Sequence, residues 1–105
     1  MFYPEFSFNL PKGFIDSNHQ IHRLGKMRAT TAKDEIIVQQ NSQVQEFSEY
    51  GILVMLSRVI TNLGNISQVT PTLLEQLLLV DFMYLQDIYY QINQLGGDWL
   101  TEGEL

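Results

Sequence analysis

The fold is decided by a stretch near the N-terminus, Leu10-Pro-Lys-Gly-Phe-Ile-Asp-Ser-Asn-His-Gln-Ile-His-Arg-Leu-Gly-Lys-Met-Arg-Ala-Thr-Thr-Ala-Lys-Asp-Glu-Ile36. It holds five of the six basic residues of the chain and passes from a β-type pattern to a helix start. Its centre, Asp16-Ser-Asn18, consists of residues that form tight turns by hydrogen-bonding to their own backbone. Before it, Phe6 to Leu10 alternates apolar and polar residues, which is the period of a half-buried strand. We therefore predict a β-hairpin or small meander over about residues 6–28.

The expected strands are short. We expect Pro11 to Gly13 to form a turn, which would separate a second strand at Phe14-Ile15 from the first. The chain would return at Gln20 to His22, and Gly25 to Arg28 would form a further short strand. Residues 1–5 are expected to be a mobile tail.

A brief helix is expected directly after the hairpin region. Thr30-Thr31 can cap a helix N-terminus, and Asp34 and Glu35 would then place negative charge in the first turn, where the helix dipole favours it. We predict this helix from Ala32 to about Val38, followed by a polar connector from Gln39 to Gln43.

A longer helix is expected in the middle of the chain. Apolar residues at helical spacing predict it from about Val44 to Leu63, and Gly64 would cap its C-terminus. Gly51 lies inside this segment. It costs about 1 kcal/mol relative to alanine, and we expect it to permit the close approach of another helix.

The C-terminal half is expected to contain one more long helix. Thr70-Pro71 predicts its start, because proline favours the first helical position. We expect it to reach about Leu95 and to stop at Gly96-Gly97, with an optional break near Val80-Asp81 at which Asp81 caps a second segment. The leucine-rich segment Leu77 to Val80 is apolar nearly all round. The sequence leaves open whether this segment closes the core of the chain or an interface.

These elements together predict an α+β fold. The chain has 105 residues, which is the length of one domain. We predict a single domain over residues 1–105, in which the N-terminal hairpin or small meander packs on a C-terminal bundle of two to three helices. The helical region would cover about residues 30–95, and residues 96–105 would form an acidic tail.

Charge is distributed unevenly along the chain. Residues 1–33 carry five basic and two acidic residues, whereas residues 34–105 carry Arg58 against ten carboxylates, and the net charge is −6. Such a chain is a poor candidate for nucleic-acid binding, because neutralisation of phosphates supplies most of that affinity. Two interpretations remain. The basic hairpin could meet a partner, or it could attract the acidic helices of its own fold.

The composition also bears on location. The chain has no cysteine, so no disulfide and no thiolate metal site can form. Met1 to Glu5 lacks the basic and apolar regions of a signal peptide, and no apolar run approaches the ~20 residues that span a bilayer. We expect a cytoplasmic protein with no membrane contact.

No set of residues indicates catalysis. His19 and His22 have only Asp16 near them in the sequence and lack the further ligands of a metal site. The carboxylates of the helical half have the spacing of a solvated helix face, and no serine-nucleophile motif or phosphate-binding loop is present. We predict that the protein is not an enzyme and uses no cofactor and no metal.

Aromatic residues near the end of the chain allow two interpretations. Tyr84, Tyr89 and Tyr90, together with Phe82 and Met83, place large side chains on more than one face of the expected helix. They either fill a core or form one edge of a groove for a partner, since tyrosine and methionine are enriched at interfaces.

Three parts of the chain form a combination that resembles a known family. They are Leu10-Pro-Lys-Gly-Phe-Ile-Asp16 with His22-Arg-Leu-Gly-Lys-Met-Arg-Ala-Thr-Thr-Ala-Lys-Asp-Glu-Ile36, Leu56-Ser-Arg-Val-Ile-Thr-Asn-Leu-Gly64 with Val69-Thr-Pro71, and Leu77 to Asn93 with Asp81, Leu85-Gln-Asp87, Tyr89 and Ile92-Asn93. This combination is similar to the phage tail assembly proteins of contractile phage tails and phage-tail-like extracellular injection systems. The similarity covers about residues 8–95, and Gly51 departs from the pattern.

The resemblance implies a non-catalytic role in tail assembly. The chain would act as a chaperone or adaptor that holds a tail or baseplate protein during assembly, or alternatively as a permanent minor subunit of the tail or baseplate. A third hypothesis is that the chain is a small DNA-binding regulator, but its net charge of −6 argues against this. A homodimer is also compatible with the sequence. The expected partner contacts are Lys12, Phe14, Arg23, Lys26, Arg28, Tyr84, Tyr89 and Tyr90.

Overall fold

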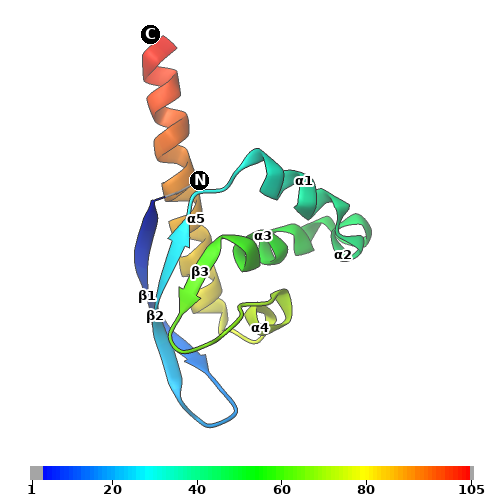
Figure 1. Ribbon diagram of the computed structural model, residues 1–105, viewed down its shortest axis with the longest axis vertical. Helices are drawn as coiled ribbons and strands as arrows, with labels where there is room; N and C mark the ends of the chain where they lie inside the picture. The colour runs from blue at the N-terminus through cyan, green and yellow to red at the C-terminus, as the bar shows by residue number, and fades with distance from the viewer. Residues whose placement is uncertain (1–3, 105) are drawn as a thin grey trace.

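A three-stranded antiparallel sheet forms one side of the molecule. A computed structural model describes the backbone of residues 4–104 and the side chains of residues 4–93. The strands are β1 (Glu5–Ile15), β2 (Ile21–Arg28) and β3 (Ile60–Leu63), in the order β1-β2-β3. Figure 1 shows the sheet beside the long helix α5 (Leu79–Glu104), with the shorter helices on the other side of β3. The predicted α+β class is confirmed.

The N-terminal hairpin is present, with longer strands than expected. Its turn follows the prediction, because the Asp16 carboxylate accepts hydrogen bonds from the backbone N–H groups of Asn18 and Gln20. The expected turn at Pro11 to Gly13 is wrong. These residues stay within β1 as a bulge, and Gly13 adopts a φ of 100° there. Glu5 already belongs to β1, and residues 1–3 lie outside the described part of the chain.

The predicted helix from Val44 to Leu63 is wrong. The segment contains four elements, namely α2 (Ser42–Glu46), the 3-10 helix η1 (Ser48–Tyr50), α3 (Gly51–Val59) and the strand β3.

Pairing with β2 explains the change from helix to strand. Ile60 and Leu63 are buried on the inner face of the sheet opposite Met27 and Gly25, and β-branched residues fit a pleated surface well. Gly64 has a positive φ, as a helix cap would, but it follows a strand, and its N–H donates to the carbonyl of Leu24.

Helix starts agree with the sequence better than helix ends do. Thr31 caps α1 (Ala32–Gln40) in a reciprocal capping box with Asp34, and Thr70 caps α4 (Pro71–Glu75). However, α4 ends after Glu75 and α5 begins at Leu79, so the break precedes Val80. The expected stop at Gly96-Gly97 is also wrong, because α5 continues to Glu104. The side chains of the expected acidic tail lie outside the described residues.

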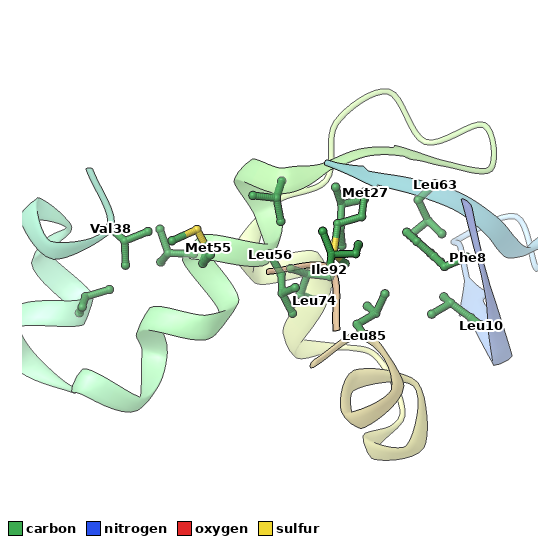
Figure 2. Packing of buried hydrophobic residues seen from close by; sticks show 14 residues of the cluster. Phe8, Leu10, Met27, Val38, Met55, Leu56, Leu63, Leu74, Leu85 and Ile92 are labelled. Carbon is green, nitrogen blue, oxygen red and sulfur yellow. The ribbon is translucent and has the colours of Figure 1, made fainter. Parts of the chain in front are cut away.

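The core runs from the sheet to the far helices, with α3 in the middle. Figure 2 shows Phe8, Leu10 and Leu63 at the sheet end, and Val38 and Met55 at the other end. Leu56, Leu74, Leu85 and Ile92 pack between them, so α4 and α5 close the centre. Within the described residues, no helix is long and apolar enough to cross a membrane.

Gly51 is replaceable, in contrast to the expectation that it permits a close helix approach. It has ordinary helical dihedral angles, and an added Cβ would lie 3.7 Å from Val38 Cγ1 and 3.8 Å from Val44 Cγ1, which is normal van der Waals contact. We predict that Gly51→Ala raises the free energy of unfolding by about 0.5 kcal/mol, because alanine restricts the unfolded chain.

Urea unfolding of the two proteins measures this effect. Gly25→Ala is the opposite control, since its Cβ would lie 2.5 Å from the Asn62 carbonyl oxygen and should destabilise. A loss of stability in Gly51→Ala would show that the protein has no room for a methyl group between Gly51 and the side chains of Val38 and Val44.

Candidate functional site

Arg28, an expected partner contact, belongs to a partly buried charge cluster around Asp34. Its guanidinium donates to both oxygens of Asp34, at 2.7 and 2.9 Å, and Arg58 Nε donates to Asp34 at 2.9 Å. The Asp34 side chain is almost fully buried. The hydrogen bonds from Arg28 are the largest cause that holds the pKa of Asp34 well below its usual value of 3.8. The cluster joins β2, α1 and α3, so for Arg28 the attraction of hairpin and helices within the fold is the correct interpretation.

A second buried carboxylate joins the hairpin to α5. Asp81 lies in the first turn of α5, and its two oxygens accept the backbone N–H groups of Lys12 and Gly13 at 2.8 and 2.9 Å. Asp81 is fully buried; its bond to Gly13 is buried and its bond to Lys12 is partly buried. The bulge in β1 therefore points the backbone N–H groups of Lys12 and Gly13 toward the Asp81 carboxylate of α5. The side chain of Lys12 remains exposed to solvent.

The three tyrosines are distributed over separate surroundings. Tyr84 is half-buried, and its hydroxyl accepts the backbone N–H of Asn9 at 3.0 Å. Tyr89 packs against the core, and burial raises the pKa of its hydroxyl. Tyr90 is exposed and meets the Tyr89 ring edge-on at a centroid distance of 5.6 Å. Core packing thus accounts for Tyr84 and Tyr89, and Tyr90 remains accessible.

His22 and Asp16 hold the hairpin turn to the loop after β3. His22 Nε2 lies 2.7 Å from Asp16 Oδ2, and Nδ1 accepts the backbone N–H of Asn65 at 3.3 Å. This arrangement places the ring proton on Nε2. The hydrogen bond from His22 is the largest cause that lowers the pKa of Asp16. The side chains described in residues 4–93 contain no group of three or more His, Cys, Asp or Glu that could hold a metal ion.

The remaining candidates lie on or behind the hairpin. Phe14 is half-buried against the core, with its ring 6.4 Å from that of His22. Arg23 and Lys26 are exposed on β2, and Arg23 Nε donates to the Leu10 carbonyl at 2.8 Å. Lys12, Arg23 and Lys26 therefore share the hairpin, away from Tyr90 on α5. The eight candidates do not form one site.

The leucine-rich segment from Leu77 to Val80 and the groove beside it form an exposed apolar surface that could bind a partner. Leu77 packs against the core, but Leu79 is 69% exposed, Leu78 58% and Val80 47%, so most of the leucine-rich segment does not close the core of this chain. One turn further along α5, Met83 is 54% exposed. Beside these residues lies a groove of about 360 Å³, which we call the joint groove. It is lined by Leu53, Leu74, Glu75, Leu77, Leu79 and Phe82.

The exposure of this segment follows from the orientation of α5. Asp81, Leu85 and Ile92 are buried, and their spacing places them on one side of the helix. Leu79 and Met83 are each two positions from Asp81, which turns them to the opposite side. Because the Asp81 carboxylate is bound to β1, the helix cannot rotate its leucine side inward without breaking both hydrogen bonds.

The charge beside the joint groove is negative. Glu75 is the charged residue among the lining residues that the structure describes, and its carboxylate accepts the Tyr50 hydroxyl at 2.6 Å. That hydrogen bond raises the pKa of Tyr50. Asp87 is exposed one turn beyond Met83 on the same side of α5. The groove thus combines apolar walls with an acidic edge, which suits a partner with apolar and basic residues.

None of the eight candidates lines this groove. The sequence contains a pattern that predicts the exposed segment. Leu77 to Val80 are four consecutive apolar residues followed by Asp81 at a break between helices, and four consecutive residues cannot all face inward. Comparisons of the chain with protein-family models, with curated proteins and with solved structures find no match.

Proposed function

We propose that this chain is a non-catalytic assembly factor of phage-tail-like particles that holds a tail or baseplate component through the joint groove. The exposure of Leu78, Leu79, Val80 and Met83 carries the proposal. Large apolar side chains that cluster on a surface mark sites of protein association, because their burial against a partner is favourable. The tail-specific part rests on the resemblance of the three sequence segments described above.

The shape of the groove favours a segment of protein as its occupant. Helices α3, α4 and α5 form its walls, and an amphipathic helix or extended segment can place apolar side chains between them. Its volume is at the lower end of the range for small-molecule pockets, and one polar residue lines it. A partner seated in the groove would remove the exposed side chain of Leu79 from water.

A permanent minor subunit of the tail or baseplate is the alternative. The same groove would serve it, because a retained subunit also binds a neighbour. The two roles differ in whether the chain stays in the mature particle, and mass spectrometry of purified particles decides between them.

Deletion of the gene in the organism that carries it tests the proposal. We predict that intact particles disappear in electron micrographs, return with the wild-type gene, and fail to return with Leu79→Glu. Leu79 is mostly exposed, so this variant should fold.

Ile36→Glu is the matched control, because Ile36 is equally apolar and 58% exposed but lies on α1. This variant should restore assembly. Normal particles without the gene, or with Leu79→Glu, would contradict the proposal.

A further inference from the structure

The hairpin carries a second exposed apolar surface. Ile15 and Ile21 form the last residue pair before the turn and are 58% and 60% exposed, and Leu24 is 67% exposed opposite Asn9. Phe8, Phe14 and Met27 face the other way and pack on or against the core. We call Ile15, Ile21, Arg23, Leu24 and Lys26 the hairpin surface.

The side chains of this surface have defined places. An added Cβ at Gly13 would come within 2.6 Å of Arg23 Cγ and 2.7 Å of Ile21 Cγ2, so both side chains lie across this glycine. The hydrogen bond from Arg23 Nε to the Leu10 carbonyl fixes the guanidinium end. Beside them lies a hollow of about 580 Å³, lined by Asn9, Ile21, His22, Arg23, Leu24, Gly64 and Asn65.

The two surfaces of the chain have opposite charge. Arg23 and Lys26 carry the positive charge of the hairpin surface. The two carboxylates near them are already hydrogen-bonded, Asp16 to His22 and turn N–H groups and Glu5 to the Thr61 hydroxyl. The joint groove has Glu75 in its lining, and Asp87 lies further along α5. Contact between two grooves would bring carboxylates together, and contact between two hairpin surfaces would bring cations together. Groove against hairpin is the pairing in which both the apolar areas and the charges match.

We propose that the hairpin surface of one copy of this chain docks into the joint groove of a second copy. Such a head-to-tail contact uses different surfaces on the two copies, so each copy keeps one free groove and one free hairpin, and further copies can add to form a ring or a filament. The inference shares the joint groove with the proposed function but does not depend on the tail component, so the two can fail separately.

The self-association of the purified protein tests this inference. We expect the molar mass from light scattering to rise with concentration for the wild-type chain. Leu24→Glu on the hairpin and Leu79→Glu in the groove should each be monomeric, whereas Ile36→Glu on α1 should associate like wild type. All three residues are exposed, so folding should persist, and circular dichroism checks it.

A mixture of the two monomeric variants gives the sharpest result. Leu24→Glu retains its groove and Leu79→Glu retains its hairpin, so an equimolar mixture should form a heterodimer and nothing larger. A wild-type chain that stays monomeric at the highest concentration would overturn the inference. So would a mixture that stays monomeric, or a Leu24→Glu variant that associates alone.

Charge reversal tests the electrostatic part. Lys26→Glu and Glu75→Lys should each weaken association about threefold, as expected for exposed ion pairs, and the double variant should recover it. Added salt should weaken the wild-type contact. Single variants that associate as tightly as wild type would show that charge does not select this pairing.

Discussion

Asp34→Asn is expected to lower the free energy of unfolding by about 3 kcal/mol. The change leaves Arg28 and Arg58 without the carboxylate that both contact, and it removes the charged half of the capping box with Thr31. Both arginines keep some access to water, at 19% and 32% side-chain exposure, which holds the cost near the lower end for a broken buried pair.

Urea unfolding at neutral pH measures this loss. Asp87→Asn is the matched control, since it makes the same chemical change at an exposed position. The control should stay within about 0.5 kcal/mol of wild type. An equal loss in both variants would show that net charge, and not the cluster, is responsible.

The same cluster predicts a dependence on acid. The folded-state pKa of Asp34 lies below its unfolded value of 3.8, so its contribution is fully present above that value and is lost as pH falls through the folded pKa. The stability difference between wild type and Asp34→Asn should therefore shrink as pH falls below 3.8. Asp16, whose pKa is also lowered, is present in both proteins and cancels in the difference. A difference that stays constant with pH would contradict the assignment.

Asp81→Asn is expected to cost about 2 kcal/mol, because hydrogen bonds to a charged acceptor are stronger than neutral ones and the amide can accept only one of the two N–H groups. The direct measurement is amide hydrogen exchange. The N–H groups of Lys12 and Gly13 should be protected in the wild-type chain and exchange much faster in the variant.

Tyr84→Phe is the comparison for this prediction. It removes a single acceptor, that of the Asn9 N–H, from an exposed hydrogen bond, so it should cost less and leave Lys12 and Gly13 protected. Equal protection of Lys12 and Gly13 in wild type and Asp81→Asn would show that the carboxylate does not hold the bulge.

Local signals in the sequence predict local structure well in this chain. The caps at Thr31 and at Thr70-Pro71 involve residues close in the sequence, and both helices begin where expected. The strand β3 was missed because its pairing with β2 joins residues more than thirty positions apart, for example Gly25 and Leu63. Its own residues also fit an apolar helical stripe, so only the distant partner decides between the two structures.

The partner-binding residues were also only partly predictable from the sequence, because their contacts depend on residues far away in the chain. The abundance of basic residues near the hairpin indicated contacts, but Arg28 is bound to Asp34 on α1, which sequence spacing does not reveal. The sequence shows the leucine-rich segment but not whether its side chains face the core or the solvent, because that orientation depends on the hydrogen bonds between Asp81 and β1. Composition therefore identified the leucine-rich segment, and the packing of α5 decided that Leu78, Leu79 and Val80 are exposed.

Thiol labelling of Met83→Cys is the most direct test of the central claim that this side of α5 docks a tail component. The chain has no cysteine, so the introduced thiol is the single site of reaction, and Gln40→Cys on α1 is the control. Both cysteines are placed in the Leu24→Glu variant, which keeps the groove but cannot dock into a second copy, so in cells that express this chain alone both thiols should react quickly. At the same expression level with the tail gene cluster, Met83→Cys should become protected while Gln40→Cys does not. Equal reactivity of Met83→Cys in both kinds of cell would contradict the account.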